Sequence, residues 1–306
     1  MITVAVVAEF NPFHNGHMYL FSKIREKFGQ DAAIITVMSG NFTQRGELAV
    51  ADKLIRGKIA VECGASLVLE LPFPFSSSSA EFFCDAAVSL ILSLGIADYL
   101  VFGSECGDLD TLVRVSDKLF SDKTEQAFRG ALRHTGYAKA KECVFTSLFP
   151  EEDVTLLRSP NNMLALGYIR ALKKYRASCL PYTFTRKGSY NGTPEKGFAG
   201  ASYLRTCFRE NDWEKASRYI PEKALSLLKE AAEDKMFPVF TDRLSSAFLS
   251  FFRLHPVPPS TGIATAESGL YAKLVSSAKF STLEDAVKNT VGKTYSYATV
   301  NRGILY

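Results

Sequence analysis

The stretch ITVAVVAEFNPFHNGHMYL, residues 2–20, decides the fold of this chain. Its first seven residues are apolar or β-branched, as in a buried strand, and a polar loop with a glycine follows them at once. From about His17 to Phe28, apolar side chains recur close to a helical period. Strand, loop and helix in this order are typical of the first unit of a parallel sheet.

The same alternation continues along the first third of the chain. Apolar runs rich in β-branched residues occupy 32–38, 66–71 and 98–102, and helical patterns lie between them at 49–64 and 80–95. Parallel strands need helical crossovers, and strands that are covered on both faces are almost continuously apolar. The sequence therefore predicts an α/β fold with a doubly wound parallel sheet.

Beyond these strands the chain becomes mostly helical. Residues 108–180 are predicted to be largely helical, a further strand begins near 180, and helical patterns dominate after about 210. On this basis we expect two domains, a sheet domain over 1–209 and a helical domain over 210–306.

The composition is that of a globular protein without a strong charge. Of the 306 residues, 47% are hydrophobic and 22% are charged, and the net charge of +4 permits an acidic partner without demanding one. The six cysteines lie far apart, without the Cys-x-x-Cys spacing of common zinc and thioredoxin-like sites. The apolar start has no basic segment before it, and no apolar stretch approaches the ~20 residues of a membrane span. We therefore expect a cytoplasmic protein without a membrane segment.

The loop after the first strand holds two of the four histidines, His14 and His17, with Gly16 between them. In an open parallel sheet, ligands bind beyond the carboxyl ends of the strands. A helix N-terminus at this place offers free N–H groups and a partial positive charge, which suit a phosphate, and Gly16 lets a ligand approach the backbone. Imidazole groups there would stabilise the charge that develops when a phosphorus atom is attacked. We predict that His14 and His17 are the catalytic residues.

Two simpler explanations of the histidines stay open at this point. A histidine can cap a helix, and a pair of histidines can bind a metal ion. The strand before the pair and the helix after it favour phosphate binding.

The pattern His-x-Gly-His at 14–17 resembles the signature of the nucleotidylyltransferase superfamily, which includes the class I aminoacyl-tRNA synthetases. Further segments occur in the order seen in one family, the bacterial tRNA(Met) cytidine acetate ligases. These segments are AEFNPFHNGH (8–17), SGNFTQRGELAVADK (39–53), GASLVLELPF (64–73), FGSE (102–105), SPNNMLALGYIRAL (159–172) and GASYLR (200–205). The resemblance covers about residues 2 to 210 well and the rest more thinly, ending on GKTYSYATVNRGILY (292–306).

The resemblance implies an enzyme with two half-reactions. It would activate acetate with ATP, releasing pyrophosphate, and then transfer the acetyl group to N4 of the wobble cytidine of elongator tRNA(Met). ATP would be a substrate, and Mg²⁺ is expected with it, although the sequence shows no dedicated carboxylate cage for a metal ion. The implied architecture is a Rossmann-like nucleotidylyltransferase domain followed by a helical domain that contributes to tRNA binding.

The resemblance also assigns ATP contacts to the first loop and to four later segments. The loop residues are Val7, Ala8, Glu9, Phe10, Asn11, Pro12, Phe13, His14, Asn15, Gly16, His17, Met18, Tyr19 and Leu20. The later residues are Gly103, either Asn161 or Asn162, Arg186 with Lys187 beside it, and Ser202 with Arg205. A glycine at a strand end leaves room for adenine or ribose, and an arginine pairs with phosphate. An ordinary turn glycine, a helix cap and a solvated arginine remain alternative explanations.

A second group of polar residues follows the second strand, in GNFTQRGE (40–47). Asn41, Gln44 and Arg45 would face the same crevice from another strand end, where they could contact acetate or the target base. An exposed turn explains these residues equally well.

The candidates for RNA binding have a weaker basis. Residues 164–210 hold nine Lys or Arg and two acids, and tyrosines are interleaved with them. We predict that Lys173 and Lys174 in this stretch, and Lys293 and Arg302 near the end, contact RNA. Solvated helix faces are the common alternative for such residues.

Two other functions are consistent with the same sequence. One is a small-molecule nucleotidylyltransferase on the same fold, because the fold does not fix the function. The other is a non-catalytic RNA-binding protein with a decayed nucleotide site, against which the intact His14, Gly16 and His17 argue. Neither sequence nor resemblance gives the oligomeric state.

Overall fold

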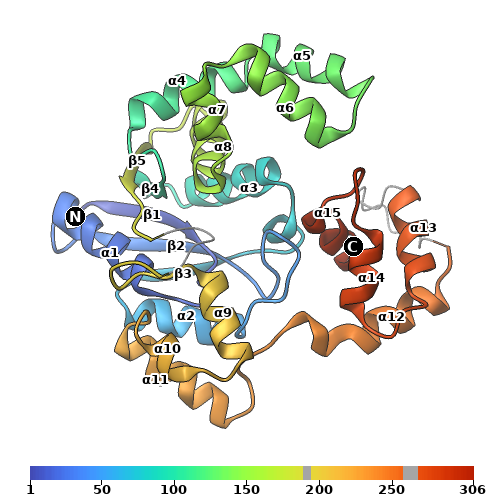
Figure 1. Cartoon of the computed structure of the whole chain (residues 1–306). Helices are drawn as coiled ribbons and strands as arrows, with labels where there is room; N and C mark the ends of the chain where they lie inside the picture. The colour runs from blue at the N-terminus through green and yellow to red at the C-terminus, as the bar shows by residue number, and fades with distance from the viewer. Residues whose placement is uncertain (189–193, 258–267) are drawn as a thin grey trace.

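A five-stranded parallel sheet lies at the centre of the molecule (Figure 1). The computed structural model describes residues 1–188, 194–257 and 268–306. The strands follow the order β3-β2-β1-β4-β5, and every neighbouring pair is parallel. They are β1 (Thr3–Ala8), β2 (Ala33–Ser39), β3 (Leu67–Leu71), β4 (Tyr99–Ser104) and β5 (Leu180–Thr185). The predicted α/β fold is confirmed.

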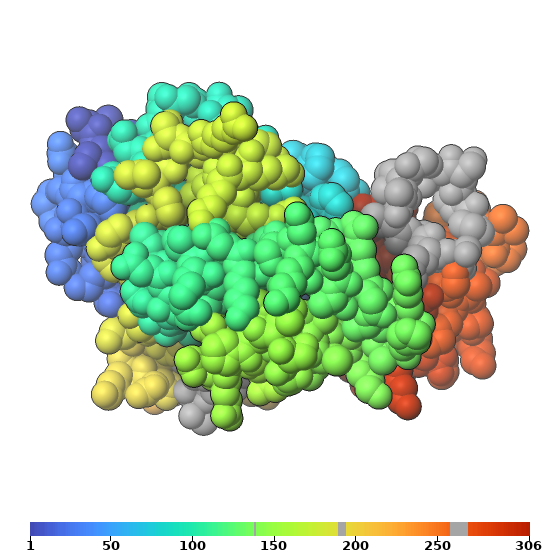
Figure 2. All heavy atoms as spheres, turned by 90° about the horizontal axis from the view of Figure 1, so that it is seen from above, coloured from blue at the N-terminus to red at the C-terminus, as the bar shows by residue number. Residues whose placement is uncertain are grey.

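Helices cover both faces of this sheet (Figure 1). One layer contains α1 (Asn15–Phe28), α2 (Lys53–Glu62), α9 (Ala201–Arg209), α10 (Trp213–Ser217) and α11 (Glu222–Glu233). The other contains α3 (Ala80–Ser93), α4 (Leu109–Leu119), α6 (Tyr137–Leu148), α7 (Glu151–Leu157) and α8 (Pro160–Lys174), with α5 (Asp122–Leu132) packed on α6. Figure 2 views the molecule from the side of this second layer, whose green and yellow-green helices cover its middle.

The alternation of side chains along β1 explains the two layers. Val4 and Val6 point into the core on the side of α1 and α2, whereas Ala5 points into the core on the side of α3 and α8. Successive residues of a strand face opposite sides, so a strand that is apolar at every position is buried on both.

The order of the strands reverses beside β1. The chain runs from β1 to β2 and β3 in one direction, and β4 and β5 lie on the other side of β1. The connections leaving β1 and β4 therefore diverge to opposite faces of the sheet. Such a switch point leaves a crevice at the carboxyl ends of the two strands, where the loop after β1 lies.

Two helices begin at positions that differ from the prediction. Helix α1 begins at Asn15 rather than near His17, because His14 is its N-cap. Helix α2 begins at Lys53 rather than at residue 49, because the Asp52 carboxylate accepts a hydrogen bond from the Leu54 N–H. A cap fixes the start of a helix more strongly than the apolar pattern does.

The C-terminal helices pack around an apolar cluster of their own, which runs from Leu249 to Ile304. They are η2 (Thr241–Leu244), α12 (Ser245–Leu254), α13 (Ser268–Ser277), α14 (Leu283–Thr290) and α15 (Tyr297–Leu305). The short η1 (Phe75–Ser77) belongs to the sheet region, between β3 and α3. Residues 213–237 share the core of α1 and α2 instead. A division of the chain at residue 209 stays a prediction, and the packing groups α10 and α11 with the sheet.

Helix α15 returns to the sheet and rests on the loop after β2. The Arg302 guanidinium donates to the Gln44 carbonyl at 3.3 Å, and the Tyr306 hydroxyl donates to the Pro74 carbonyl at 3.0 Å. A Cβ atom at Gly46 would lie 2.5 Å from the Arg302 backbone nitrogen, and the φ of Gly46 is +76°. Only glycine permits this conformation together with this close approach.

The part of the chain that the structure describes contains no helix with the length and apolar character needed to cross a bilayer.

The side chain of Arg56 holds the strand ends together from inside the molecule. Its relative exposure is 1%, and its guanidinium donates to the carbonyls of Glu9 (2.6 Å), Ala51 (2.9 Å), Ser39 (3.1 Å) and Gly40. One side chain of α2 thereby joins the ends of β1 and β2 to the segment before α2. The sequence analysis did not predict this role, because an arginine in a helical pattern ordinarily lies at the surface.

Replacing Arg56 by Met should lower the free energy of unfolding by about 3 kcal/mol or more, since several buried carbonyls would lose their donor. Urea unfolding of the purified variant measures this loss. Lys58→Ala on the same helix is the matched control, because the Lys58 side chain is 60% exposed and its contact with Glu230 is 4.0 Å long. An equal, small effect of both substitutions would contradict the structural role of Arg56.

Candidate nucleotide site

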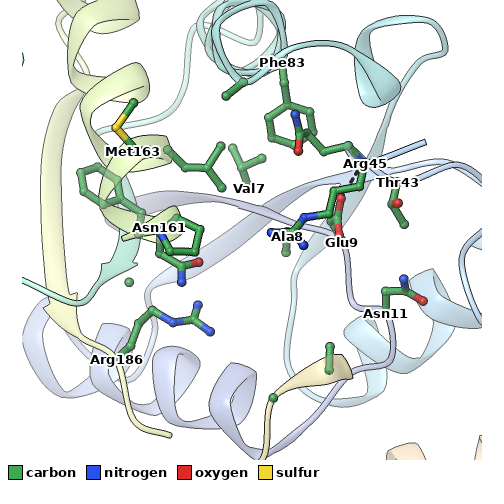
Figure 3. A pocket seen from close by; sticks show the side chains of 18 of the residues that line it. Val7, Ala8, Glu9, Asn11, Thr43, Arg45, Phe83, Asn161, Met163 and Arg186 are labelled. Atoms are coloured by element: carbon green, nitrogen blue, oxygen red, sulfur yellow. Dashed lines mark hydrogen bonds between the residues drawn. The ribbon is translucent and has the colours of Figure 1, made fainter. Parts of the chain in front are cut away.

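A cavity of about 640 Å³ opens at the carboxyl ends of β1 and β4. Figure 3 shows Val7 and Ala8 between two groups of polar side chains, with Asn161 and Arg186 on one side and Glu9 and Arg45 on the other. Many of the predicted residues line it together. They are Val7, Ala8, Glu9, Phe10, Asn11, His14, His17, Leu20, Gln44, Arg45, Gly103, Asn161, Arg186, Ser202 and Arg205.

His14 and His17 lie stacked at the N-terminus of α1, with their ring centroids 3.9 Å apart. The Nδ1 atom of His14 accepts a hydrogen bond from the Gly16 N–H at 3.0 Å, and Nδ1 of His17 accepts from the His14 N–H at 3.1 Å. The two rings thus form a capping box, so the simpler explanation of helix capping is also correct. An acceptor Nδ1 in a neutral imidazole leaves the proton on Nε2. Both rings therefore keep an Nε2–H donor for a ligand in the cavity.

Burial keeps both imidazoles neutral. It lowers the pKa of His14 from 6.5 to about 3, and the positive charge of Arg186 acts in the same direction. Burial also lowers the pKa of His17 well below its usual value, and His14 and Arg186 add to that shift. The histidines can therefore act as hydrogen-bond donors at neutral pH without carrying a charge.

Gly16 is needed for the position of the His14 ring. A Cβ atom at residue 16 would lie 2.8 Å from Cε1 and 2.9 Å from Nδ1 of His14. The glycine therefore makes room for the His14 imidazole, in addition to any closer approach of a ligand.

Aromatic rings support His17 from the core side. The Phe10 ring meets His17 edge-on at 4.9 Å between centroids, and the Phe13 ring lies 5.2 Å away. Both phenylalanines are buried, and Phe10 has a φ of +46°. A non-glycine residue in the left-handed region is strained, and such strain is concentrated at functional loops.

Arg186 lies across the end of β4. A Cβ atom at Gly103 would be 2.8 Å from Cγ of Arg186, so this glycine makes room for the arginine rather than only for a nucleotide. Burial lowers the pKa of Arg186, and the negative charge of Glu105 opposes that shift. A guanidinium remains charged in proteins, so Arg186 places a positive charge next to the histidines.

The structure separates the roles of the two neighbouring asparagines. Asn161 lines the cavity, and its amide donates to Oε1 of Glu105 at 2.6 Å. Asn162 is buried, and its side chain accepts from the Cys106 N–H and donates to the Leu156 carbonyl. Asn161 is therefore the one that can contact a ligand.

A second helix N-terminus, that of α9, also lies at the cavity wall, where Gly200, Ala201 and Ser202 line it. Its N-cap is Gly200, so Ser202 is not the cap and remains available at the cavity wall. Arg205 donates to the Asn11 carbonyl at 3.0 Å and lies 3.8 Å from the Glu47 carboxylate. Two helix N-termini at one cavity, with Arg186 and Arg205 beside them, make a site suited to an anion with several charges.

Comparisons with known proteins agree with this geometry. Residues 1–306 match the family model described as HIGH Nucleotidyl Transferase. A tRNA(Met) cytidine acetate ligase of Thermoanaerobacter sp. (strain X514) is 35% identical over 99% of this chain and 77% of its own length, and that of Syntrophotalea carbinolica (strain DSM 2380 / NBRC 103641 / GraBd1) is 36% identical over 100% and 74%. A crystal structure of Thermotoga maritima TmcAL bound with alpha-thio ATP has a TM-score of 0.87 and 30% identity, covering all of this chain and 74% of that chain.

The chain belongs to the tRNA(Met) cytidine acetate ligase family.

Some residues that the family resemblance singled out lie outside the main cavity. Pro12, Phe13, Met18 and Asn162 do not line it, and Asn15 ties the start of α1 to the Gly197 and Arg218 carbonyls. Gly16, Tyr19 and Lys187 line a small side pocket of about 40 Å³ next to the histidines.

Of the three polar residues predicted after β2, two line the cavity and one does not. Gln44 and Arg45 line the cavity, and the Gln44 side chain donates to the Ser78 carbonyl at 2.8 Å. Asn41 does not line it, because its side chain binds Asp52 and the Lys53 N–H at the start of α2. In this member of the ligase family, Asn41 therefore supports a helix terminus rather than a substrate pocket.

The basic residues predicted to bind RNA have partners of their own. Lys173 forms an ion pair with Asp117, and Lys174 pairs with Asp85 at 2.6 Å. Lys293 is exposed, whereas Arg302 is partly buried against the Gln44 carbonyl. Their contact with RNA stays a prediction.

Several wall residues were missed by the sequence analysis. Phe83, Phe145, Leu157 and Tyr168 form an apolar wall, and Lys141, Glu142 and Arg158 reach the cavity from α6 and the end of α7. The apolar members follow ordinary core patterns, and the charged members sit in exposed-looking helices. No local signal distinguishes either group, since their position depends on how the second helix layer packs.

The lowered pKa of His14 predicts that the free energy of unfolding depends on pH. Because the pKa of folded His14 is about 3 and that of the unfolded chain is 6.5, the unfolded state binds a proton first as the pH falls. His14 should therefore lower the free energy of unfolding by about 2 kcal/mol between pH 8 and pH 5.

Replacement of His14 by Asn tests this, because Asn can still accept the Gly16 N–H as an N-cap without titrating. Urea unfolding of both proteins at pH 8, 6.5 and 5 should show a weaker pH dependence in the variant. Parallel curves for wild type and variant would contradict a depressed pKa at His14.

Proposed function

We propose that this protein activates acetate with ATP and transfers the acetyl group to N4 of the wobble cytidine of elongator tRNA(Met). The relatives that carry this name match nearly the whole chain, and the related TmcAL structure was solved with an ATP analogue. The observation that carries the proposal is the pair of neutral histidines with available Nε2–H groups, at a helix N-terminus on the cavity wall.

In the first half-reaction, an oxygen of acetate attacks the α-phosphorus of ATP. The bond to the bridging oxygen breaks, and pyrophosphate leaves with its electron pair. Acetate is already an anion, so no general base is needed. The Nε2–H groups of His14 and His17 would donate to phosphate oxygens whose charge grows, and Arg186 would stabilise the same charge.

The segment GASYLR (200–205), at the N-terminus of α9, suits the departing pyrophosphate. Ser202 and Arg205 line the cavity, and Arg205 donates to the Asn11 carbonyl in the loop before α1. Asn161 and Gly103, on the side of β4, would contact the adenosine part, as the family resemblance implies. These assignments of individual ATP contacts are part of the proposal.

Mg²⁺ is proposed to enter with ATP. The described residues contain no group of three or more His, Cys, Asp or Glu side chains that could hold a metal ion. Mg²⁺ retains several waters and binds substrate phosphates, so the triphosphate itself would supply its main ligands and the ion would neutralise part of its charge.

The C-terminal helices are proposed to help bind the tRNA. Lys293 and Tyr297 are exposed there, and α15 packs directly on the loop of Gln44, which lines the cavity. A positive and aromatic surface next to the catalytic cavity suits an anticodon loop.

The decisive experiment measures pyrophosphate release from ATP with acetate, with and without elongator tRNA(Met), followed by nucleoside analysis of the tRNA. N4-acetylcytidine at the wobble position is the expected product. Pyrophosphate release without modified tRNA would instead indicate adenylyl transfer to another acceptor, and the absence of both would refute the proposal.

Two substitutions of His17 test the role of its Nε2–H group. Asparagine can keep the acceptor near Nδ1 but has no donor at the Nε2 position, whereas glutamine can bring an amide N–H close to it. Acetate-dependent ATP–pyrophosphate exchange should fall about 10²–10³-fold in His17→Asn. In His17→Gln the loss of exchange should be smaller by a factor of at least about ten. Unchanged exchange in His17→Asn, with an intact fold by thermal unfolding, would exclude this mechanism.

A further inference from the structure

The carboxylate of Glu9 stands at the end of β1 inside the cavity, and the first half-reaction gives it no task. Its Oε1 accepts a hydrogen bond from the Gln44 N–H at 2.7 Å. The other oxygen, Oε2, forms no hydrogen bond or ion pair with any residue in the part of the chain that the structure describes. Glu9 also lines the cavity wall, so an acceptor oxygen remains for a ligand.

The position of this carboxylate is fixed from both sides. The Arg56 guanidinium donates to the Glu9 backbone carbonyl at 2.6 Å, and the backbone N–H of Gln44 donates to the Glu9 carboxylate. The Gln44 side chain in turn donates to the Ser78 carbonyl, and the Gln44 carbonyl accepts a hydrogen bond from Arg302. A group that is held in this way needs little reorganisation when a substrate reaches it.

Charges of both signs surround Glu9. Burial raises its pKa, while the Gln44 N–H and the positive charges of Arg205 and Arg56 lower it and the negative charge of Glu47 raises it further. A carboxyl group whose pKa lies above its usual value accepts a proton more readily than a solvated one.

We propose that Oε2 of Glu9 accepts the N4–H of the target cytidine and takes that proton during acetyl transfer. The inference rests on the proposed function and names the base for its second half-reaction. Glutamate and aspartate are the side chains that match the N4 amino group of cytosine, which is a hydrogen-bond donor.

The step is balanced as follows. The N4 nitrogen attacks the carbonyl carbon of acetyl-adenylate, and a C–N bond forms. The C–O bond of the mixed anhydride breaks, and AMP leaves with its electron pair. The proton of N4 moves to Glu9 and from there to solvent. Because the lone pair of N4 is delocalised into the ring, removing this proton as the bond forms makes the amine a better nucleophile.

Other groups of the cavity are less suited to this task. His14 and His17 already use Nδ1 as an acceptor and present only donors. Of the described carboxylates that line the cavity, Glu142 pairs with Arg158 and Glu47 lies 3.8 Å from the Arg205 guanidinium. Of these three carboxylates, Glu9 is the one that forms no ion pair with a described residue.

The test separates the two half-reactions in Glu9→Gln. Glutamine retains an oxygen for the Gln44 N–H but cannot take a proton. One assay measures acetate-dependent ATP–pyrophosphate exchange without tRNA, and the other supplies acetyl-adenylate directly and follows N4-acetylcytidine in elongator tRNA(Met) under single-turnover conditions. Transfer should fall by about 10²-fold or more, and at least about tenfold more than exchange.

Glu70→Gln is the matched control. Glu70 lies near the end of β3, pairs with Lys53 at 2.6 Å and does not line the cavity, so both assays should change equally little. Glu9→Asp retains a carboxylate, and it should recover part of the transfer that Glu9→Gln loses.

Three results would overturn the inference. Equal losses of exchange and transfer in Glu9→Gln would indicate a structural or nucleotide-binding role. Rescue of exchange by high Mg²⁺ in that variant would indicate a metal ligand instead of a base. A wild-type protein that performs neither half-reaction would refute the proposed function itself, and this assignment with it.

Discussion

The hydrogen bonds of the buried Arg56 guanidinium are the constraint on which the site depends. They join the carbonyls that end β1 and β2, and these strand ends carry Glu9 and the loop of Gln44. A guanidinium directs its donors in a fixed plane, so it can set several backbone segments at once. The cost of burying its charge is offset by these carbonyl dipoles and by the negative charges of Glu9, Asp52 and Glu70 nearby.

The site combines neutral hydrogen-bond donors, the two imidazoles, with charged guanidinium groups. Two imidazoles stay neutral since they are buried beside Arg186, and they still present N–H groups at a helix terminus. Arg186 and Arg205 are among the residues that bring full positive charges to the cavity. Fixed dipoles of this kind stabilise developing charge without reorganising during the reaction, which is the basis of electrostatic catalysis.

The sequence predicted the parts of this molecule that depend on local patterns. Strand and helix periods gave the parallel sheet, and His14, Gly16 and His17 marked the loop at the switch point. It could not predict the partners of single side chains across the fold. Neither the Asn41 contact with α2 nor the difference between Asn161 and Asn162 follows from the sequence, because each depends on a neighbour that the packing brings close. The cavity walls from α6 and α7 were missed for the same reason.

The loop from Thr43 to Glu47 touches both the cavity and the C-terminal helices. Gly46 lies against the backbone of Arg302, and Gln44 binds both Glu9 and Arg302. A shift of the loop at its cavity side would therefore change its contacts with α15. Any ligand that favours one position of α15 must, to the same extent, favour the matching state of the cavity, because binding free energies at linked sites are reciprocal. Under the proposed function, the binding of ATP in the cavity and the binding of tRNA beside α15 would therefore be coupled.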